Sequence, residues 1–246
     1  MKNLIVANWK MNPTSQKEAE DIFSKIKEGA KDTSAEVIIC PPFIYLSLLK
    51  GLTLGAQDCF YEDKGTFTGE ISPVMLKGMG VEYVIIGHSE RRKNGETNEV
   101  VNKKLKKALG SGLNAILCIG ETMEQREAGE TEGVLEDQLN SALEGVSVSD
   151  KINVAYEPLW AISTGDPYKT KELPTPEKIK KIGEYIKGLL VKVYDGEAGK
   201  IRMIYGGSAN GQNAKSYLQD GGMQGLLVGG ASLKPEEFIK IVKSAE

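Results

Sequence analysis

Four polar side chains stand where short apolar runs of this sequence end, and their types suit proton-transfer chemistry. Asn8 and Lys10 follow the first run, His88 follows a later run in the sequence GHSE, and Glu157 follows another in YEP. A carboxylate beside a neutral imidazole and a cation can remove a proton from a carbon next to a carbonyl group, because the imidazole and the cation stabilise the charge that develops on oxygen. These residues therefore predict a site that forms an enediolate.

His88 is the only histidine of the chain, and a lone histidine is more often structural than catalytic. Its place between an apolar run and the next helix favours chemistry, because a helix N-terminus disfavours the imidazolium form and leaves a neutral donor. Taken singly, each polar residue at the end of a strand is accounted for by simple solvation. Their common position at the ends of several strands is what favours a shared site.

Paired glycines follow the last two apolar runs. Gly206 and Gly207 precede Ser208, and Gly229 and Gly230 close the final run. Glycines at such positions are often only turn residues, but they also let backbone N–H groups approach a phosphate closely. Barrels frequently bind phosphate in the loops after strands seven and eight, so we expect a phosphate cradle here.

The elements that must position these residues are short and nearly continuously apolar. Runs of this kind occupy residues 4–7, 37–40, 52–56, 83–87, 115–120, 152–156, 202–205 and 225–230. Such runs are typical of parallel strands covered on both faces. Alternation with helix-like segments predicts a closed parallel (β/α)₈ barrel that forms a single domain over residues 1–246. A doubly wound open sheet remains the alternative, because counting strands does not show closure.

Helix boundaries are also indicated. Ser15 and Glu18 have the spacing of a capping box. Thr175, Pro176 and Glu177 resemble a cap, a first-turn proline and an acidic first turn, and Ser232 with Pro235 is expected to open the last helix in a similar way. The third helix must be short, or replaced by a loop around residues 65–69. In the first strand, alternation places Asn8 and Lys10 on the same face.

Composition excludes several classes of function. Lys and Arg total 31 against 34 Asp and Glu, giving a net charge of -3, which argues against nucleic-acid or polybasic membrane binding. Cys40, Cys59 and Cys118 lack the spacing of a disulfide framework or a zinc site, so we expect buried thiols, no metal and a cytoplasmic location. The start MKNLIVANWKMN has only a short apolar run, unlike a signal peptide.

Six longer motifs, in the order ANWKMN, GTFTGEIS, GHSERR, AYEPLWAISTG, YGGSAN and GLLVGGASLKP, resemble the triosephosphate isomerase family over nearly the whole chain. The resemblance implies a TIM barrel that interconverts dihydroxyacetone phosphate and D-glyceraldehyde 3-phosphate without a cofactor, in glycolysis and gluconeogenesis. Matched residue by residue, it makes Glu157 the base and His88 the electrophile, with Lys10 as the cation. Asn8 and Glu90 are supporting residues.

The same resemblance assigns substrate-binding and interface residues. Asn8 and Lys10 contact the substrate, and its phosphate meets Ser163, Ser208, Gly229 and Gly230. Family members are usually homodimers, so the resemblance implies self-association through the loop at residues 65–70. In that loop Thr68 and Glu70 are interface residues, and Thr68 supports the partner's site.

Three departures from the family pattern stand out. The candidate lid is the segment that follows Glu157, residues 158–165. Its far hinge reads Ile-Ser-Thr-Gly where Ile-Gly-Thr-Gly is usual, which places Ser163 at the hinge. Residues 166–174 form a longer polar segment, and Asp58 stands where the family has asparagine. Two rival functions remain, another phosphosugar isomerase of the same fold and a non-catalytic barrel that binds a phosphate ligand. The joint presence of NWK, GHSE and AYEP argues against the other isomerase, and the intact Glu157 and His88 argue against the non-catalytic barrel.

Overall fold

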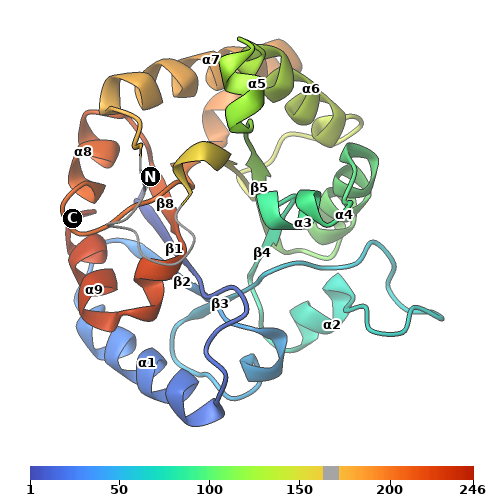
Figure 1. Ribbon diagram of the computed structural model, residues 1–246. Coiled ribbons are helices and arrows are strands. Elements are labelled where there is room, and N and C mark those ends of the chain that lie inside the picture. The colour runs from blue at the N-terminus through green and yellow to red at the C-terminus, as the bar shows by residue number, and fades with distance from the viewer. Residues whose placement is uncertain (163–171) are drawn as a thin grey trace.

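The computed structural model describes residues 1–162 and 172–246, and over these residues eight parallel strands close into a barrel. Each strand pairs with the next along the chain, and β1 pairs with β8 to complete the ring (Figure 1). The predicted (β/α)₈ barrel is confirmed, and the open doubly wound sheet is excluded. The strands are β1 (Leu4–Asn8), β2 (Glu36–Cys40), β3 (Thr53–Ala56), β4 (Tyr83–Ile86), β5 (Asn114–Ile119), β6 (Ile152–Tyr156), β7 (Arg202–Tyr205) and β8 (Gly225–Val228).

Helices alternate with the strands and surround the barrel as an outer ring (Figure 1). The α-helices are α1 (Gln16–Gly29), α2 (Pro73–Gly78), α3 (Ser89–Lys93), α4 (Asn98–Gly110), α5 (Met123–Glu127), α6 (Thr131–Leu143), α7 (Pro176–Tyr194), α8 (Ala214–Gln219) and α9 (Pro235–Lys243). Short 3₁₀ turns occupy η1 (Phe43–Tyr45), η2 (Leu159–Ala161), η3 (Asp195–Lys200) and η4 (Gly230–Leu233). As expected, the helix between β3 and β4 is short, and a long loop precedes it.

Two of the three predicted helix starts are confirmed. Ser15 caps α1 by accepting the Glu18 N–H at 3.3 Å, and Thr175 caps α7, with Pro176 in the first turn. The expectation for Ser232 is wrong, although Pro235 does open α9. Ser232 is buried within η4, where its hydroxyl donates to the Gly229 carbonyl at 2.6 Å, so it braces the end of β8 instead of capping a helix.

The core has two layers, one inside the barrel and one between the strands and the helices. Along β1, Leu4 and Val6 belong to the inner layer, while Ile5 and Ala7 belong to the outer one. This alternation follows from the two-residue period of a strand. The inner layer consists of Leu4, Val6, Ile38, Cys40, Tyr83, Ile85, Ile116, Cys118, Ala155, Ile204 and Leu227.

The amino-terminal end of the barrel is closed by a polar bridge across its mouth. Tyr83, at the start of β4, donates its hydroxyl proton to the Glu36 carboxylate at the start of β2. Arg202, at the start of β7, donates to the other oxygen of Glu36 at 2.7 Å. One carboxylate therefore links three strands that are not neighbours in the sheet.

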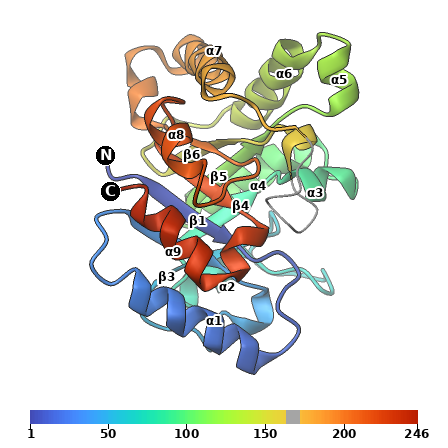
Figure 2. The ribbon, with the colours of Figure 1, turned by 60° about the vertical axis from the view of Figure 1, so that its left-hand side comes forward.

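The chain begins and finishes at nearly the same place. Both termini lie close together in the two views of Figures 1 and 2, and the Asn3 side chain donates to the Ala245 carbonyl at 2.9 Å. Over the described part of the chain, no helix combines the length and the apolar character that crossing a bilayer requires.

Candidate active site

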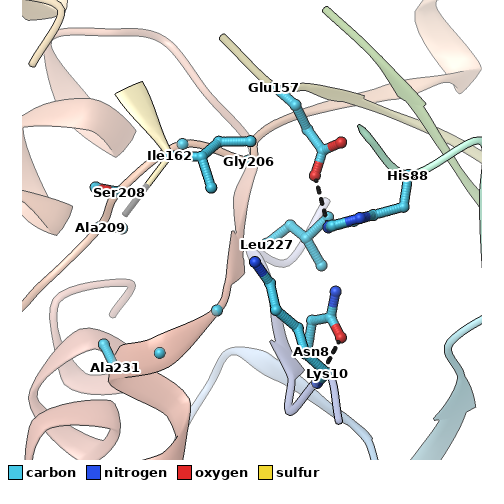
Figure 3. Close-up of a pocket in the computed structure, with 13 residues that line it drawn as sticks. Asn8, Lys10, His88, Glu157, Ile162, Gly206, Ser208, Ala209, Leu227 and Ala231 are labelled. Atoms are coloured by element: carbon cyan, nitrogen blue, oxygen red, sulfur yellow. Dashed lines mark hydrogen bonds and ion pairs between the residues drawn. The ribbon is translucent and has the colours of Figure 1, made fainter. Parts of the chain in front are cut away.

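The polar residues predicted from the sequence meet in one pocket at the carboxyl ends of the strands (Figure 3). The pocket holds about 390 Å³ of empty space, including the part open to solvent. Its walls come from the loops after β1, β4, β6, β7 and β8, as expected for a barrel enzyme. The lining residues are Asn8, Lys10, His88, Glu157, Ile162, Gly206, Gly207, Ser208, Ala209, Leu227, Gly229, Gly230 and Ala231.

Glu157 and His88 face each other across this pocket (Figure 3). The Glu157 Oε1 atom lies 3.2 Å from His88 Nε2, and the second carboxylate oxygen accepts the Ser89 N–H at 3.0 Å. Glu157 directly follows β6, and only 2% of its side chain is exposed. A buried carboxylate and an imidazole thus stand close enough together to act on the same small molecule.

The hydrogen bonds of His88 assign its tautomer. His88 is the N-cap of α3, and its Nδ1 atom accepts the Glu90 N–H at 3.2 Å. An accepting nitrogen carries no proton, so the ring proton lies on Nε2 and points toward Glu157. The structure therefore presents a neutral imidazole with its donor directed into the pocket, in keeping with the expectation from the helix start.

Lys10 reaches the pocket through an unusual backbone conformation. Its φ of 54° lies in the left-handed region, which costs a non-glycine residue about 1–2 kcal/mol. Two hydrogen bonds hold it there: its N–H donates to Asn8 Oδ1 at 3.0 Å, and Gln57 Nε2 donates to its carbonyl at 2.8 Å. Asn8 and Lys10 share a face as predicted, but through this turn and not through strand alternation.

The charge of Lys10 is matched by Glu90. Lys10 Nζ lies 2.7 Å from Glu90 Oε1. Partial burial acts to raise the pKa of Glu90, but the hydrogen bond and the charge of Lys10 outweigh it and leave that pKa below its ordinary value. Glu90 therefore stays ionised and holds the ammonium group beside the pocket.

The residues expected to form a phosphate cradle, apart from Ser163, also line the pocket. Gly229 and Gly230 stand at the start of η4, where the first N–H groups of a helical turn lack partners within it. A Cβ atom on Gly229 would lie in ordinary contact with Lys10 Cε, at 3.5 Å, so this glycine adjoins the lysine side chain. Ser208 is in the same pocket, and its N–H donates to the Ala161 carbonyl at 2.9 Å. Ser163 lies outside the described residues.

Other predicted residues lie away from the pocket. Thr68 and Glu70 are exposed on the long loop after β3. Asp58, the departure noted at the base of this loop, is bound at 2.7 Å through both of its oxygens to the buried Lys104, and Arg91 lies 3.0 Å away. The additional carboxylate therefore anchors the loop to α3 and α4.

Two glycines decide where Glu157 can lie, a role that the sequence did not predict for either of them. A Cβ atom on Gly120 would sit 1.8 Å from the Glu157 carbonyl oxygen, and one on Gly206 would sit 2.7 Å from Glu157 Cγ. Both glycines directly follow strands that flank β6 in the sheet. In the sequence Gly120 is only a glycine at the end of an apolar run, and Gly206 was expected to act as a turn or phosphate-loop residue and not to make room for Glu157.

Two further positioning residues were also missed. Arg92 donates from Nε to the Gly87 carbonyl at 2.9 Å, which fixes the turn that presents His88. Gln57 bonds both Lys10 and the Cys40 carbonyl, the latter at 3.0 Å, and so joins the loops after β1 and β2. Arg92 lies inside the GHSERR motif quoted above and Gln57 directly precedes Asp58, but the roles of both depend on contacts between distant segments.

The Cys118 thiol near Glu157 is not suited to form a covalent bond with a substrate. Burial, with a further contribution from the Glu157 carboxylate, raises the pKa of the Cys118 thiol well above its ordinary value, so this cysteine stays protonated. Within residues 1–162 and 172–246, no group of three or more His, Cys, Asp or Glu side chains is arranged to hold a metal ion.

Comparisons with known proteins agree with this geometry. The family model described as Triosephosphate isomerase matches residues 3–245. A triosephosphate isomerase from Aquifex aeolicus is 47% identical, covering 99% of this chain and 100% of that protein. Relatives with the same name from Alkaliphilus oremlandii (45% identity, 98% of each chain) and Dictyoglomus thermophilum (46% identity, 99% of each chain) are equally complete matches. The pocket built from Lys10, His88 and Glu157 thus lies in a chain that belongs to the triosephosphate isomerase family.

Proposed function

We propose that this protein interconverts dihydroxyacetone phosphate and D-glyceraldehyde 3-phosphate, with Glu157 as the base. The observation that carries the proposal is the pairing of Glu157 with His88 at 3.2 Å, inside a pocket that also holds Lys10 and the two-glycine turn after β8. The family relationship supports the same reaction.

The Glu157 carboxylate removes a proton from the carbon next to the carbonyl group and returns it to the neighbouring carbon. The carbonyl oxygen becomes the enediolate oxygen, and the hydroxyl proton moves between the two substrate oxygens. Both hydrogens stay within the reaction, so it consumes no oxidant or reductant. Because Glu157 and His88 face each other across the pocket, the substrate must enter between them.

His88 and Lys10 stabilise the charge that appears on oxygen. The Nε2–H group of His88 donates to the oxygens of the enediolate, and the ammonium group of Lys10 adds positive charge on the same side. Asn8 supports Lys10 through its Oδ1 atom, and its amide nitrogen is directed into the pocket (Figure 3). Such preorganised donors are usually the largest single contribution to catalysis.

The non-reacting end of the substrate is held by Ser208, Gly229 and Gly230, which line the opposite part of the pocket. Binding at the phosphate fixes the reacting carbons relative to Glu157, and binding energy away from the reaction centre is used for orientation. Ser163 remains a predicted phosphate contact from the family pattern.

The proposal is tested by a coupled assay in both directions, together with NMR of the products formed in D₂O. Proton abstraction from carbon predicts turnover of both triose phosphates. It also predicts deuterium at the carbon that receives the proton, because the proton held on Glu157 can exchange with D₂O before it is returned. Binding of substrate without turnover would instead identify a phosphate-binding barrel. Turnover of a different phosphosugar alone would identify another isomerase.

Glu157→Ala is expected to lower kcat by at least about 10²–10⁴-fold, the usual contribution of a positioned base. The measurement is kcat in the coupled assay, with far-UV circular dichroism to verify the fold. A variant that keeps a near-normal kcat would remove Glu157 from this role.

We also propose that residues 1–246 act as one domain within a cytoplasmic homodimer. Pairing of β1 with β8, which joins the two ends of the chain, supports the single domain. Three buried free thiols, Cys40, Cys59 and Cys118, support a reducing compartment. The exposed loop that carries Thr68 and Glu70 supports self-association.

A further inference from the structure

We propose that Glu172 is a positioning residue for the isomerase reaction, acting through Arg126 on Trp160 and so on the turn that carries Glu157. This inference rests on the proposed function. It concerns a group of side chains outside the pocket, behind Glu157, which the mechanism above does not use.

The turn that carries Glu157 is bound to the strand end beside it. The Glu157 N–H donates to the Ile119 carbonyl at 2.8 Å, and the Leu159 N–H donates to the Glu121 carbonyl at 3.0 Å. The Glu121 side chain is 1% exposed, and its Oε1 atom accepts both the Tyr156 hydroxyl at 3.1 Å and Trp160 Nε1 at 2.8 Å. One carboxylate oxygen therefore holds the residues on both sides of Glu157.

Trp160 is the member of this group that can most easily reorient. Its only described hydrogen bond from the ring is the one to Glu121, and its outer face is covered by Arg126. The guanidinium carbon of Arg126 lies 3.8 Å from the centre of the Trp160 ring. A planar guanidinium group stacked on an indole ring is a favourable cation–π arrangement, and it limits how far the ring can swing outward.

Arg126 is in turn held by Glu172. Arg126 Nη2 donates to Glu172 Oε1 at 2.8 Å, and the two side chains are 26% and 48% exposed. The hydrogen bond from Arg126 lowers the pKa of Glu172, so the carboxylate is ionised at neutral pH. An unpaired arginine samples many rotamers, so the carboxylate restricts the guanidinium group to its place over the indole ring. The path therefore runs from Glu172 through Arg126 and Trp160 to Glu121 Oε1, the oxygen that also binds Tyr156, the residue before Glu157.

The first test compares Glu172→Gln with the wild type and with Glu184→Gln. The control makes the same charge change at Glu184, an exposed residue of α7. Exposed ion pairs have small effects, so we expect Glu172→Gln to lower kcat by about two- to fivefold, with little change in KM. We expect no change in the control. A salt series adds a second readout, because 1 M NaCl screens the Glu172–Arg126 pair only in the wild type and should therefore lower its kcat by a larger factor than that of Glu172→Gln.

Acrylamide quenching of tryptophan fluorescence tests the position of Trp160 directly, without reference to activity. The chain has two tryptophans, and Trp9 is 0% exposed, so an added quencher reports mainly on Trp160. We expect the quenching constant to rise in Glu172→Gln and to stay at the wild-type value in Glu184→Gln. A purely structural role for Glu172 would change thermal stability without changing kcat or the quenching constant.

A double variant tests whether Glu172 acts on kcat through Arg126. If Glu172 acts through Arg126, Arg126→Gln combined with Glu172→Gln should lower kcat no further than Arg126→Gln alone. Additive losses, or wild-type kcat and quenching in Glu172→Gln, would overturn the proposal. Absence of isomerase activity in the wild type would overturn the proposed function instead, and the quenching experiment would still decide whether Glu172 braces Trp160.

Discussion

At the scale of single residues, the site depends on glycines, which have no side chain, as much as on the polar residues that line the pocket. Glu157 lies between Gly120 and Gly206, and neither position has space for a Cβ atom. Lys10 is held in a left-handed conformation by Asn8 and Gln57. The reacting groups were predictable from their types and from their places at strand ends. Of the residues that hold them, Asn8 and Glu90 were also expected, but Gln57, Arg92 and Gly120 were not, because their roles arise from contacts between distant segments.

Gly120→Ala tests this dependence. The new Cβ atom would meet the Glu157 carbonyl oxygen at 1.8 Å, so the backbone that carries the base must move. A displacement of about 1 Å can cost about 10²-fold in rate, and overpacking typically costs about 1–3 kcal/mol in stability. We expect kcat to fall at least about tenfold in the coupled assay. The free energy of unfolding, measured with urea, should decrease by about 1–3 kcal/mol.

Gly188→Ala is the matched control. Gly188 lies within α7, and a Cβ atom there meets no neighbour within 4 Å. Alanine in a helix interior is favoured over glycine by about 0.5–1 kcal/mol, so this variant should be slightly more stable and have an unchanged kcat. Equal behaviour of the two variants would show that crowding at Glu157 is unimportant.

At the scale of elements, the apolar runs predicted the strands closely. Residues 152–156 and 202–205 are strands to the residue, and the other runs differ by one or two residues at their ends. Short, nearly continuous apolar segments are well suited to a buried parallel sheet, which explains this success. The polar bridge at the barrel mouth was not foreseen, because Glu36, Tyr83 and Arg202 are far apart in the sequence and each looks like an ordinary strand start.

This bridge predicts a pH dependence. Burial, and then the hydrogen bond to Glu36, raise the pKa of Tyr83 above its ordinary value. Above about pH 10, where an unfolded tyrosine loses its proton, the folded protein still retains one. The folded state then binds more protons than the unfolded state, so the free energy of unfolding must fall as pH rises.

Tyr83→Phe is expected to be less stable than the wild type at pH 7 by about 1–3 kcal/mol, because one oxygen of Glu36 loses its partner. The variant should nevertheless lose less stability than the wild type between pH 9 and 11. Urea unfolding at fixed protein concentration measures both effects. Parallel pH curves for the two proteins would contradict this account of Tyr83.

At the scale of the whole molecule, exposed apolar side chains gather on one side of the barrel. They lie in the loops after β1, β2 and β3 and on α2, and the loop after β3 extends beyond the helices in Figure 1. An exposed apolar patch of this kind marks an interaction surface. Its members are Met11, Ile44, Leu48, Phe67, Val74, Met75 and Met79. Met11 is 91% exposed although it adjoins Lys10, so the patch reaches the edge of the active site.

We therefore expect a dimer in solution, with Thr68 and Glu70 at its interface. Light scattering combined with assays over a dilution series is the measurement. A charged substitution, Met75→Lys, should weaken association and lower specific activity at low protein concentration. The control, Val191→Lys, changes an exposed apolar residue of α7, away from the patch. A wild-type monomer with full activity would contradict the dimer.

The meeting of the two termini has a consequence for how this polypeptide can be rearranged. Because Asn3 already bonds the Ala245 carbonyl, a few residues of linker would span the two ends. Fresh ends could then be cut in η3, a connection that leads into the start of a strand and so lies away from the pocket. Such a circular permutant should form the same barrel and retain turnover, because every strand of a closed barrel keeps its two neighbours whichever strand comes first in the chain.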